Sequence, residues 1–235
     1  MSLPVQLPLG VQLRDDVTFA NFYGGANGAL VNMLDMDKTL PGVETEQFIF
    51  LYGNKGVGCS HLLQAACNQV DRRDGRSIYL PMSELVYYSP QLLEGMERLQ
   101  LVCIDDLGKI AGIPEWEEAV FDLFNRLRDS HTRFLVAAKH PPKNLGIKLP
   151  DLVSRLNWGL VYQVQPLNDT DKVAALQLRG HIRGLEINEE VARYIVYRSC
   201  RDMGKLFKIL HKLDSASLRA KRKLTIPFVK QVMDW

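Results

Sequence analysis

A glycine-rich segment follows a short apolar stretch and has the composition of a phosphate-binding loop. Gly53 and Gly58 are separated by four residues, and Ser60 follows two positions later, as in the P-loop pattern. Glycine allows successive backbone N–H groups to face a phosphate, and the helix that follows adds the positive end of its dipole. We therefore expect this loop to bind nucleotide phosphates, with Ser60 as a magnesium-binding hydroxyl. The expected phosphate-binding residues are Gly53, Gly56, Val57, Gly58, Cys59, Ser60 and His61.

The P-loop pattern places a lysine directly before the hydroxyl residue, but this chain has Cys59 there. A thiol is at best a weak hydrogen-bond donor and carries no positive charge. A bound triphosphate would therefore lack a direct counter-charge, so the sequence predicts nucleotide binding with weak hydrolysis. A glycine-rich turn without a ligand is the alternative. The sequence leaves open whether Lys55 or Lys139 replaces the missing charge.

Two adjacent carboxylates follow the apolar segment 101–104. Ligand sites in α/β proteins lie at the carboxyl ends of the strands, so Asp105 is placed to hold magnesium through water. Asp106 occupies the position where a longer Glu commonly polarises the attacking water, and we interpret it as a weak catalytic residue. The alternative is an Asp pair that caps a turn.

Five short apolar segments alternate with helix-forming segments and would position these groups. The alternation predicts a parallel sheet, and after Pro166 the capping residues indicate helices only. The sequence therefore predicts an α/β P-loop fold with a five-stranded parallel sheet, followed by a small all-helical domain. We expect an extended tail at 1–16, a nucleotide-binding α/β domain at 17–166 and a helical domain at 167–235. The expected strands are 48–52, 78–80, 101–104, 134–138 and 160–164.

The composition of the 235 residues, 46% hydrophobic and 24% charged, is typical of a folded protein. The apolar runs are as short as strands, which excludes a membrane span, and the N-terminus lacks the basic segment of a signal peptide. We therefore expect a cytoplasmic protein. The four cysteines are scattered without a Cys-x-x-Cys pair, which favours reduced thiols.

The net charge of +2 conceals an asymmetry along the chain. Residues 172–235 contain 14 Lys or Arg against six Asp or Glu, a net charge of +8, which leaves −6 on residues 1–171. A basic helical segment can serve phosphate chemistry, nucleic acid or an acidic partner, or can simply be a solvated face.

Two further features have more than one interpretation from the residues alone. Arg155 lies four residues after Asp151 on a predicted helix, and this spacing favours an exposed ion pair over a catalytic role. Gln6-Leu7-Pro8-Leu9 in the tail has the form of a docking peptide, although such a segment can equally pack against its own chain.

Taken together, these motifs resemble the AAA+ ATPases of the DnaA replication-initiator type, over nearly the whole chain. Within that family the chain is most similar to the Hda group of replication regulators, in which the P-loop lysine position is also degenerate. The segment 18–22 resembles the family's adenine-pocket segment, which implies that Phe19, Asn21 and Phe22 contact the base. The resemblance implies an AAA+ core with a helical lid, an adenine nucleotide with ADP favoured over ATP, and Mg²⁺.

The resemblance also gives roles to arginines outside the P-loop. The segment 149–156 is similar to the box that carries the arginine finger, which implies that Arg155 enters the nucleotide site of a neighbouring subunit. Arg201-Asp202-Met203 resembles the sensor 2 motif, which implies that Arg201 faces this chain's own phosphates. Lys139 departs from the polar or acidic residue that the family has at sensor 1.

The tail motif is similar to the short peptide by which replication proteins bind the polymerase's sliding clamp, which implies that Gln6, Leu7 and Leu9 fill a groove on the clamp. The implied function is negative regulation of replication initiation, in which the protein, together with the clamp, stimulates hydrolysis of DnaA-bound ATP. We expect no DNA-binding domain after the lid, so that DNA is reached through the clamp, and we leave homo-oligomerisation open. A free-standing ATPase or loader acting on DNA or a helicase is the alternative, and a small-molecule kinase is disfavoured.

Overall fold

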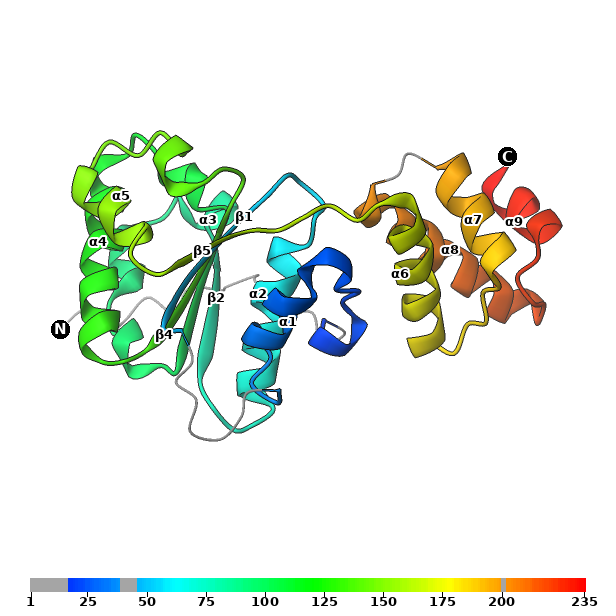
Figure 1. Ribbon diagram of the computed structural model, residues 1–235, viewed down its shortest axis with the longest axis horizontal. Helices are drawn as coiled ribbons and strands as arrows, with labels where there is room; N and C mark the ends of the chain where they lie inside the picture. Colours follow the sequence, from blue (N-terminus) through cyan, green and yellow to red (C-terminus); the bar gives the residue numbers. More distant parts are fainter. Residues whose placement is uncertain (1–16, 39–45, 200–201) are drawn as a thin grey trace.

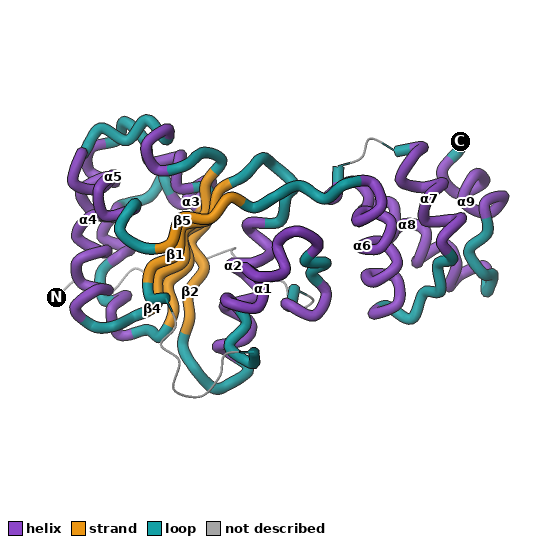
Figure 2. Tube along the Cα trace, viewed as in Figure 1, coloured by secondary structure: helices purple, strands orange, loops and turns teal. Residues whose placement is uncertain are grey.

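The computed structural model describes residues 17–38, 46–199 and 202–235. Its centre is one sheet of five strands in the order β2-β3-β4-β1-β5, and every neighbouring pair is parallel. The predicted five-stranded parallel sheet is confirmed (Figure 2). The strands are β1 Phe48–Tyr52, β2 Ser77–Pro81, β3 Leu101–Asp105, β4 Arg133–Ala138 and β5 Leu160–Gln163.

Helices cover both faces of this sheet, as parallel strands require (Figure 1). One face packs against α1 (Gly28–Leu34) and α2 (Cys59–Asp71), and the other packs against α3 (Met82–Leu85), α4 (Pro114–Asp129) and α5 (Pro150–Leu156). Side chains of β3 and β4 alternate between the two cores, so that Leu135 and Ala137 face α2 while Phe134 and Val136 face α4. This alternation decides which strand-end residues reach the P-loop side.

Short 3₁₀ turns connect several of these elements. They are Phe19–Asn21, Gly25–Asn27, Pro90–Leu93, Met96–Arg98, Leu107–Ile110 and Pro142–Asn144.

The described residues after β5 contain helices α6 (Asp169–Ile182), α7 (Glu189–Arg198), α8 (Met203–Ala220) and α9 (Ile226–Met233). These helices share a separate core that includes Leu176, Ile195, Leu210 and Val229, and they lie to one side of the sheet (Figure 1). A helical lid after the α/β part is therefore confirmed.

Side-chain caps explain where each lid helix begins. The side chains of Asn168, Asn188, Asp202 and Thr225 accept hydrogen bonds from backbone N–H groups three residues ahead. The first of these helices begins at Asp169, and Asn168 is its cap, since its side chain accepts from the Asp171 N–H at 2.8 Å.

Two of the sequence-based expectations fall outside this description. The tail motif with Gln6, Leu7 and Leu9 precedes residue 17, and Arg201 lies in the gap at 200–201. Within the described ranges, no helix is long and apolar enough to cross a membrane.

Candidate functional site

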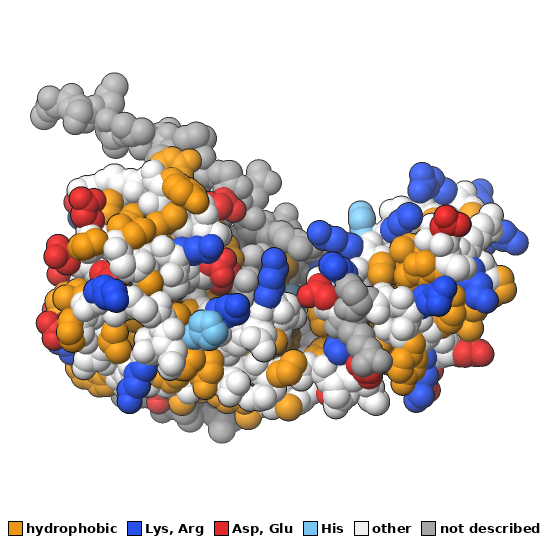
Figure 3. Space-filling view, turned by 90° about the horizontal axis from the view of Figure 1, so that it is seen from above, with side chains coloured by type: hydrophobic (Ala, Val, Ile, Leu, Met, Phe, Trp, Pro, Cys, Tyr) orange, Lys and Arg blue, Asp and Glu red, His pale blue; other side chains and the backbone are white. Residues whose placement is uncertain are grey.

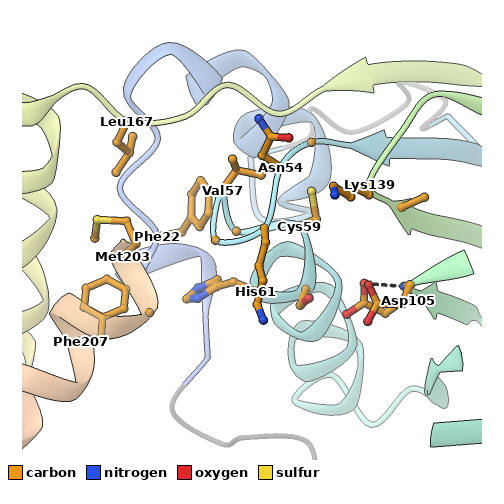
Figure 4. A pocket seen from close by; sticks show the side chains of 18 of the residues that line it. Phe22, Asn54, Val57, Cys59, His61, Asp105, Lys139, Leu167, Met203 and Phe207 are labelled. Atoms are coloured by element: carbon orange, nitrogen blue, oxygen red, sulfur yellow. Dashed lines mark hydrogen bonds between the residues drawn. The ribbon is translucent and has the colours of Figure 1, made fainter. Parts of the chain in front are cut away.

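A cavity of about 750 Å³ lies between the P-loop, the carboxyl ends of β3 and β4, and the start of α8 (Figure 4). It is large enough for a nucleotide, which agrees with the 300–1,000 Å³ range typical of ligand pockets. Every expected phosphate-binding residue of the loop lines it, as do Asp105 and Asp106. The residues on its walls that the sequence analysis did not single out include Tyr23, Lys109, Leu167, Ala175, Gly204 and Phe207.

The P-loop glycines adopt conformations that other residues rarely allow. Gly56 has φ +89° and Gly58 has φ +107°, both in the left-handed region that favours glycine. A Cβ on Gly58 would lie 2.6 Å from the Phe22 ring, and one on Gly56 would lie 2.9 Å from the Asp202 carboxylate. The loop therefore needs glycine for its backbone turns and for the close approach of both neighbouring walls.

Cys59 begins α2 and is held in its neutral form. Burial, followed by the nearby charge of Asp105, raises the pKa of its thiol to about 12. At neutral pH the side chain is therefore an uncharged thiol. It offers no counter-charge to a phosphate, as the sequence predicted.

Asp105 is nearly fully buried at the end of β3 and is held by two donors. Its Oδ1 accepts from the backbone N–H of Asp106 at 2.9 Å, and its Oδ2 accepts from the hydroxyl of Tyr79 on β2 at 2.5 Å. Burial, followed by the charge of Asp105, raises the pKa of Tyr79, so this hydroxyl remains a donor. Tyr79 was not identified from the sequence, because an aromatic residue in a strand ordinarily indicates packing.

Asp106 is placed beside the cavity by an unusual backbone conformation, with φ +53°. Burial and the adjacent Asp105 charge raise the pKa of its carboxyl, while Lys109 and Lys55 act in the opposite direction. The positive charges of two cavity lysines therefore act on the Asp106 carboxyl and favour its charged form.

The expected magnesium ligands fit the ion in part. Ser60 and Asp105 both line the cavity, and each Asp105 oxygen has one in-chain donor, which leaves lone pairs for a metal-bound water. No group of three His, Cys, Asp or Glu side chains that could hold a metal occurs among the described residues. Magnesium would therefore be bound through one or two protein ligands together with phosphate oxygens, which is its usual mode.

Two of the three residues expected to contact the adenine base lie at the cavity. Asn21 and Phe22 line the cavity, and the Phe22 and His61 rings lie 5.3 Å apart, with His61 within 2.9 Å of the Thr18 carbonyl. Phe19, also expected to contact the base, does not line the cavity, because its side chain is only 8% exposed and packs into the core on the α2 face. The 3₁₀ turn directs Phe19 inward and Phe22 toward the cavity.

The opposite wall comes from the lid and is apolar. Met203 and Phe207 on α8 lie opposite Phe22, with Leu167 above them, as Figure 4 shows. The sequence could not have placed Phe207 there, because its helical spacing is equally consistent with the lid core, against which it also packs.

Arg155 lies away from this cavity, on α5, beside a small depression lined by Phe48, Phe124 and Leu156. Its guanidinium lies 4.9 Å from the centre of the Trp158 ring, and that ring is 59% exposed. The ion pair with Asp151 that the spacing favoured is not present in the described structure. Arg155 is therefore half-buried beside Trp158 and does not line the nucleotide cavity of its own chain.

The chain resembles known families in two adjacent parts. Residues 13–163 match the family described as the bacterial DnaA ATPase domain, and residues 169–233 match the lid domain of Hda. The junction between the two matches falls between β5 and α6.

Solved structures show the same architecture. Domain III of the Thermotoga maritima replication initiation protein DnaA is 22% identical, with a TM-score of 0.76, and the match covers 95% of this chain and 98% of that one. AMPPCP-bound DnaA from Aquifex aeolicus is 23% identical, with a TM-score of 0.71 and coverages of 85% and 65%. The Thermotoga maritima Holliday junction branch migration motor RuvB is 15% identical, with a TM-score of 0.69 and coverages of 95% and 73%. At these identities the likeness shows the AAA+ fold. The match to the DnaA ATPase domain spans more than half of the chain, so the chain belongs to the bacterial DnaA-type AAA+ family, and it carries a lid of the Hda type.

Proposed function

We propose that the protein is a cytoplasmic negative regulator of replication initiation that stimulates hydrolysis of the ATP bound to DnaA. In this proposal its own nucleotide is a structural ligand, and Arg155 acts in the nucleotide site of DnaA. The observation that carries the proposal is the separation of two half-sites: a cavity without its P-loop lysine, and an arginine on α5 that does not line that cavity.

The first half-site supports binding without efficient turnover. The loop backbone, Asp105 and the apolar wall would hold an adenine nucleotide, with ADP as the resident form and Mg²⁺ between Ser60, Asp105 and the phosphates. The neutral thiol of Cys59 leaves the charge that develops on a transferring phosphoryl group without its usual partner. Binding of the non-hydrolysable analogue AMPPCP is shown for DnaA from Aquifex aeolicus, a protein of the same fold.

The second half-site supports action in trans. An arginine finger must reach phosphates on a neighbouring subunit. Its guanidinium therefore has to be accessible at the subunit interface and held in a fixed orientation by neighbouring side chains. Arg155 is half-buried, its guanidinium lies against the exposed Trp158 ring, and no ion pair among the described residues involves it, which supports this role. DnaA is the proposed neighbour because this chain shares its fold and would pack against it as one AAA+ subunit packs against the next.

The tail motif would deliver the regulator to replicating DNA. Gln6, Leu7 and Leu9 are proposed to bind the sliding clamp, so that DNA is reached through the clamp rather than directly. Extended peptides commonly bind in this way, with alternate side chains filling pockets of a groove.

The proposal is tested by measuring hydrolysis of DnaA-bound ATP with the protein, the clamp and DNA, and by measuring the protein's own turnover separately. We expect strong stimulation of DnaA and negligible turnover by the protein alone. Substantial turnover of its own, without stimulation of DnaA, would support a free-standing ATPase instead.

The alternative of an ATPase or loader acting on DNA has one observation in its favour. Basic side chains gather over the lid on the face shown in Figure 3, and Arg219, Lys221, Arg222 and Lys223 are exposed at the end of α8 and beyond it. Salt-dependent binding of DNA by the protein without the clamp would favour this alternative.

A further inference from the structure

The P-loop of this chain lacks a positive charge at Cys59, but three lysines of the described chain line the same cavity. They are Lys55 in the loop, Lys109 in the 3₁₀ turn after β3, and Lys139 directly after β4. None of the three forms an ion pair with a described carboxylate within 4.0 Å. The ammonium group of each lysine is therefore available to bind a phosphate, and the positions of the three lysines in the fold distinguish them.

Sheet geometry directs Lys139 to the P-loop. β4 lies between β1, which leads into the loop, and β3, which ends at Asp105. Along β4, Leu135 and Ala137 face α2, so the alternation continued by two residues turns Lys139 to the same face. Cys59 and Asp105 lie on that face too, since Cys59 packs in the α2-side core and Cys103, two residues before Asp105, is buried in it.

The backbone holds this strand end against the start of the loop. The Gly53 N–H donates to the Ala138 carbonyl at 3.2 Å. Lys139, the next residue after Ala138, is therefore held beside the first glycine of the P-loop. Figure 4 shows the Lys139 side chain running from the end of β4 toward Cys59. Lys139 therefore approaches the phosphate side of the cavity from the end of β4, whereas a P-loop lysine would approach it from position 59 at the start of α2.

The other two lysines act elsewhere in the cavity. Lys55 lies in the loop itself, between Gly53 and Gly56, and Lys109 lies in the 3₁₀ turn Leu107–Ile110 that follows β3. Lys139 instead follows β4, whose end accepts the Gly53 N–H, and it lies on the same sheet face as Cys59.

We propose that Lys139 has taken over the role of the missing P-loop lysine and binds the nucleotide phosphates from the end of β4. This inference rests on the proposed nucleotide ligand and adds the residue that neutralises it. An ammonium at this point, with Cys59 opposite, provides charge for binding a diphosphate.

The inference is tested by titrating the whole protein with ADP and with adenosine, which lacks phosphates. Lys139→Ala should weaken ADP binding at least about ten-fold, the loss expected for a charge-assisted hydrogen bond, and leave adenosine binding unchanged. Lys139→Arg should retain most of the ADP affinity. Lys143→Ala removes a neighbouring exposed lysine outside the cavity and serves as the charge-matched control.

A compensating variant makes the test specific. Cys59→Lys restores the P-loop charge, so that adding Lys139→Ala to it should have little further effect on ADP affinity. Equal ADP binding by wild type and Lys139→Ala would overturn the inference and leave the nucleotide ligand intact. Failure of the wild-type protein to bind ADP at all would overturn both.

Discussion

Glu117 on α4 accepts a 2.8 Å hydrogen bond at Oε2 from the backbone N–H of Leu149, the residue directly before α5. The same carboxylate accepts from the N–H groups of Lys148 and Gly112, and its side chain is 2% exposed. An acidic residue in the first turn of a helix ordinarily interacts with the helix dipole at the surface. Here it fixes the start of the helix that carries Arg155.

Glu117→Ala should destabilise the protein and release the start of α5. Three backbone N–H groups lose a charged acceptor in a buried place, so we expect the free energy of unfolding to fall by about 3 kcal/mol. Chemical denaturation measures the loss. Glu118→Ala removes an exposed acid from the same turn and should change stability little, and an equal loss in both variants would contradict this role.

Gly58→Ala should impair nucleotide binding through both its backbone and its neighbour. The added Cβ would lie 2.6 Å from the Phe22 ring at a φ of +107°, so the base-side wall or the loop must move. Gly95→Ala is the matched control, because Gly95 also has a positive φ, +77°, but nothing lies within 4 Å of its Cβ position. We expect ADP affinity to fall in the first variant and to persist in the second. Equal ADP affinities in the two variants would contradict the claim that the loop has no space for a side chain at position 58.

The thiol of Cys59 should resist alkylation at neutral pH. Its pKa is raised to about 12, and the thiolate is the reactive form, so the folded protein is protected until the pH approaches that value. Mass spectrometry after iodoacetamide treatment at pH 8 should find Cys59 unmodified in the folded protein and modified in denaturant. Rapid modification of the folded protein, absent in Cys59→Ser, would contradict the raised pKa.

Changing Gln6 and Leu7 to Ala should abolish binding of the sliding clamp while leaving the melting temperature unchanged. In the proposed function these side chains contact the clamp, so their loss removes clamp binding and not packing within this chain. A clamp pull-down and a thermal melt measure the two effects. Leu13→Ala changes an apolar residue of the same segment outside the motif, and undiminished clamp binding by the double variant would refute the assignment.

The fold and the P-loop could be predicted because their signals are local. Glycine spacing, the strand-sized apolar segments and the carboxylates after residue 104 each act over a few neighbouring residues. Their convergence in one cavity then follows from the rule that parallel strands bring their carboxyl ends to one edge. Lys139, one of the two lysines named as candidates for the missing charge, directly follows the predicted strand 134–138.

The remaining features depend on contacts between distant segments. Tyr79 and Asp105 are 26 residues apart, and Glu117 and Leu149 are 32 apart, so no local pattern pairs them. Phe19 was assigned to the adenine pocket, but the direction of a side chain in a 3₁₀ turn is set by the core beside it. The spacing of Asp151 and Arg155 predicted an ion pair that the described structure does not contain. The Arg155 guanidinium lies against the Trp158 ring instead, which the turn after α5 brings close.

The central claim is that Arg155 supplies an arginine finger to DnaA, and the rate of hydrolysis of DnaA-bound ATP in the presence of clamp and DNA tests it most directly. Arg155→Ala should reduce the stimulated rate by about 10³-fold or to the rate of DnaA alone, while clamp binding, ADP binding and stability persist. Arg128→Ala, which removes the other arginine near the Trp158 ring, should stimulate like the wild type. Undiminished stimulation by Arg155→Ala would contradict the account.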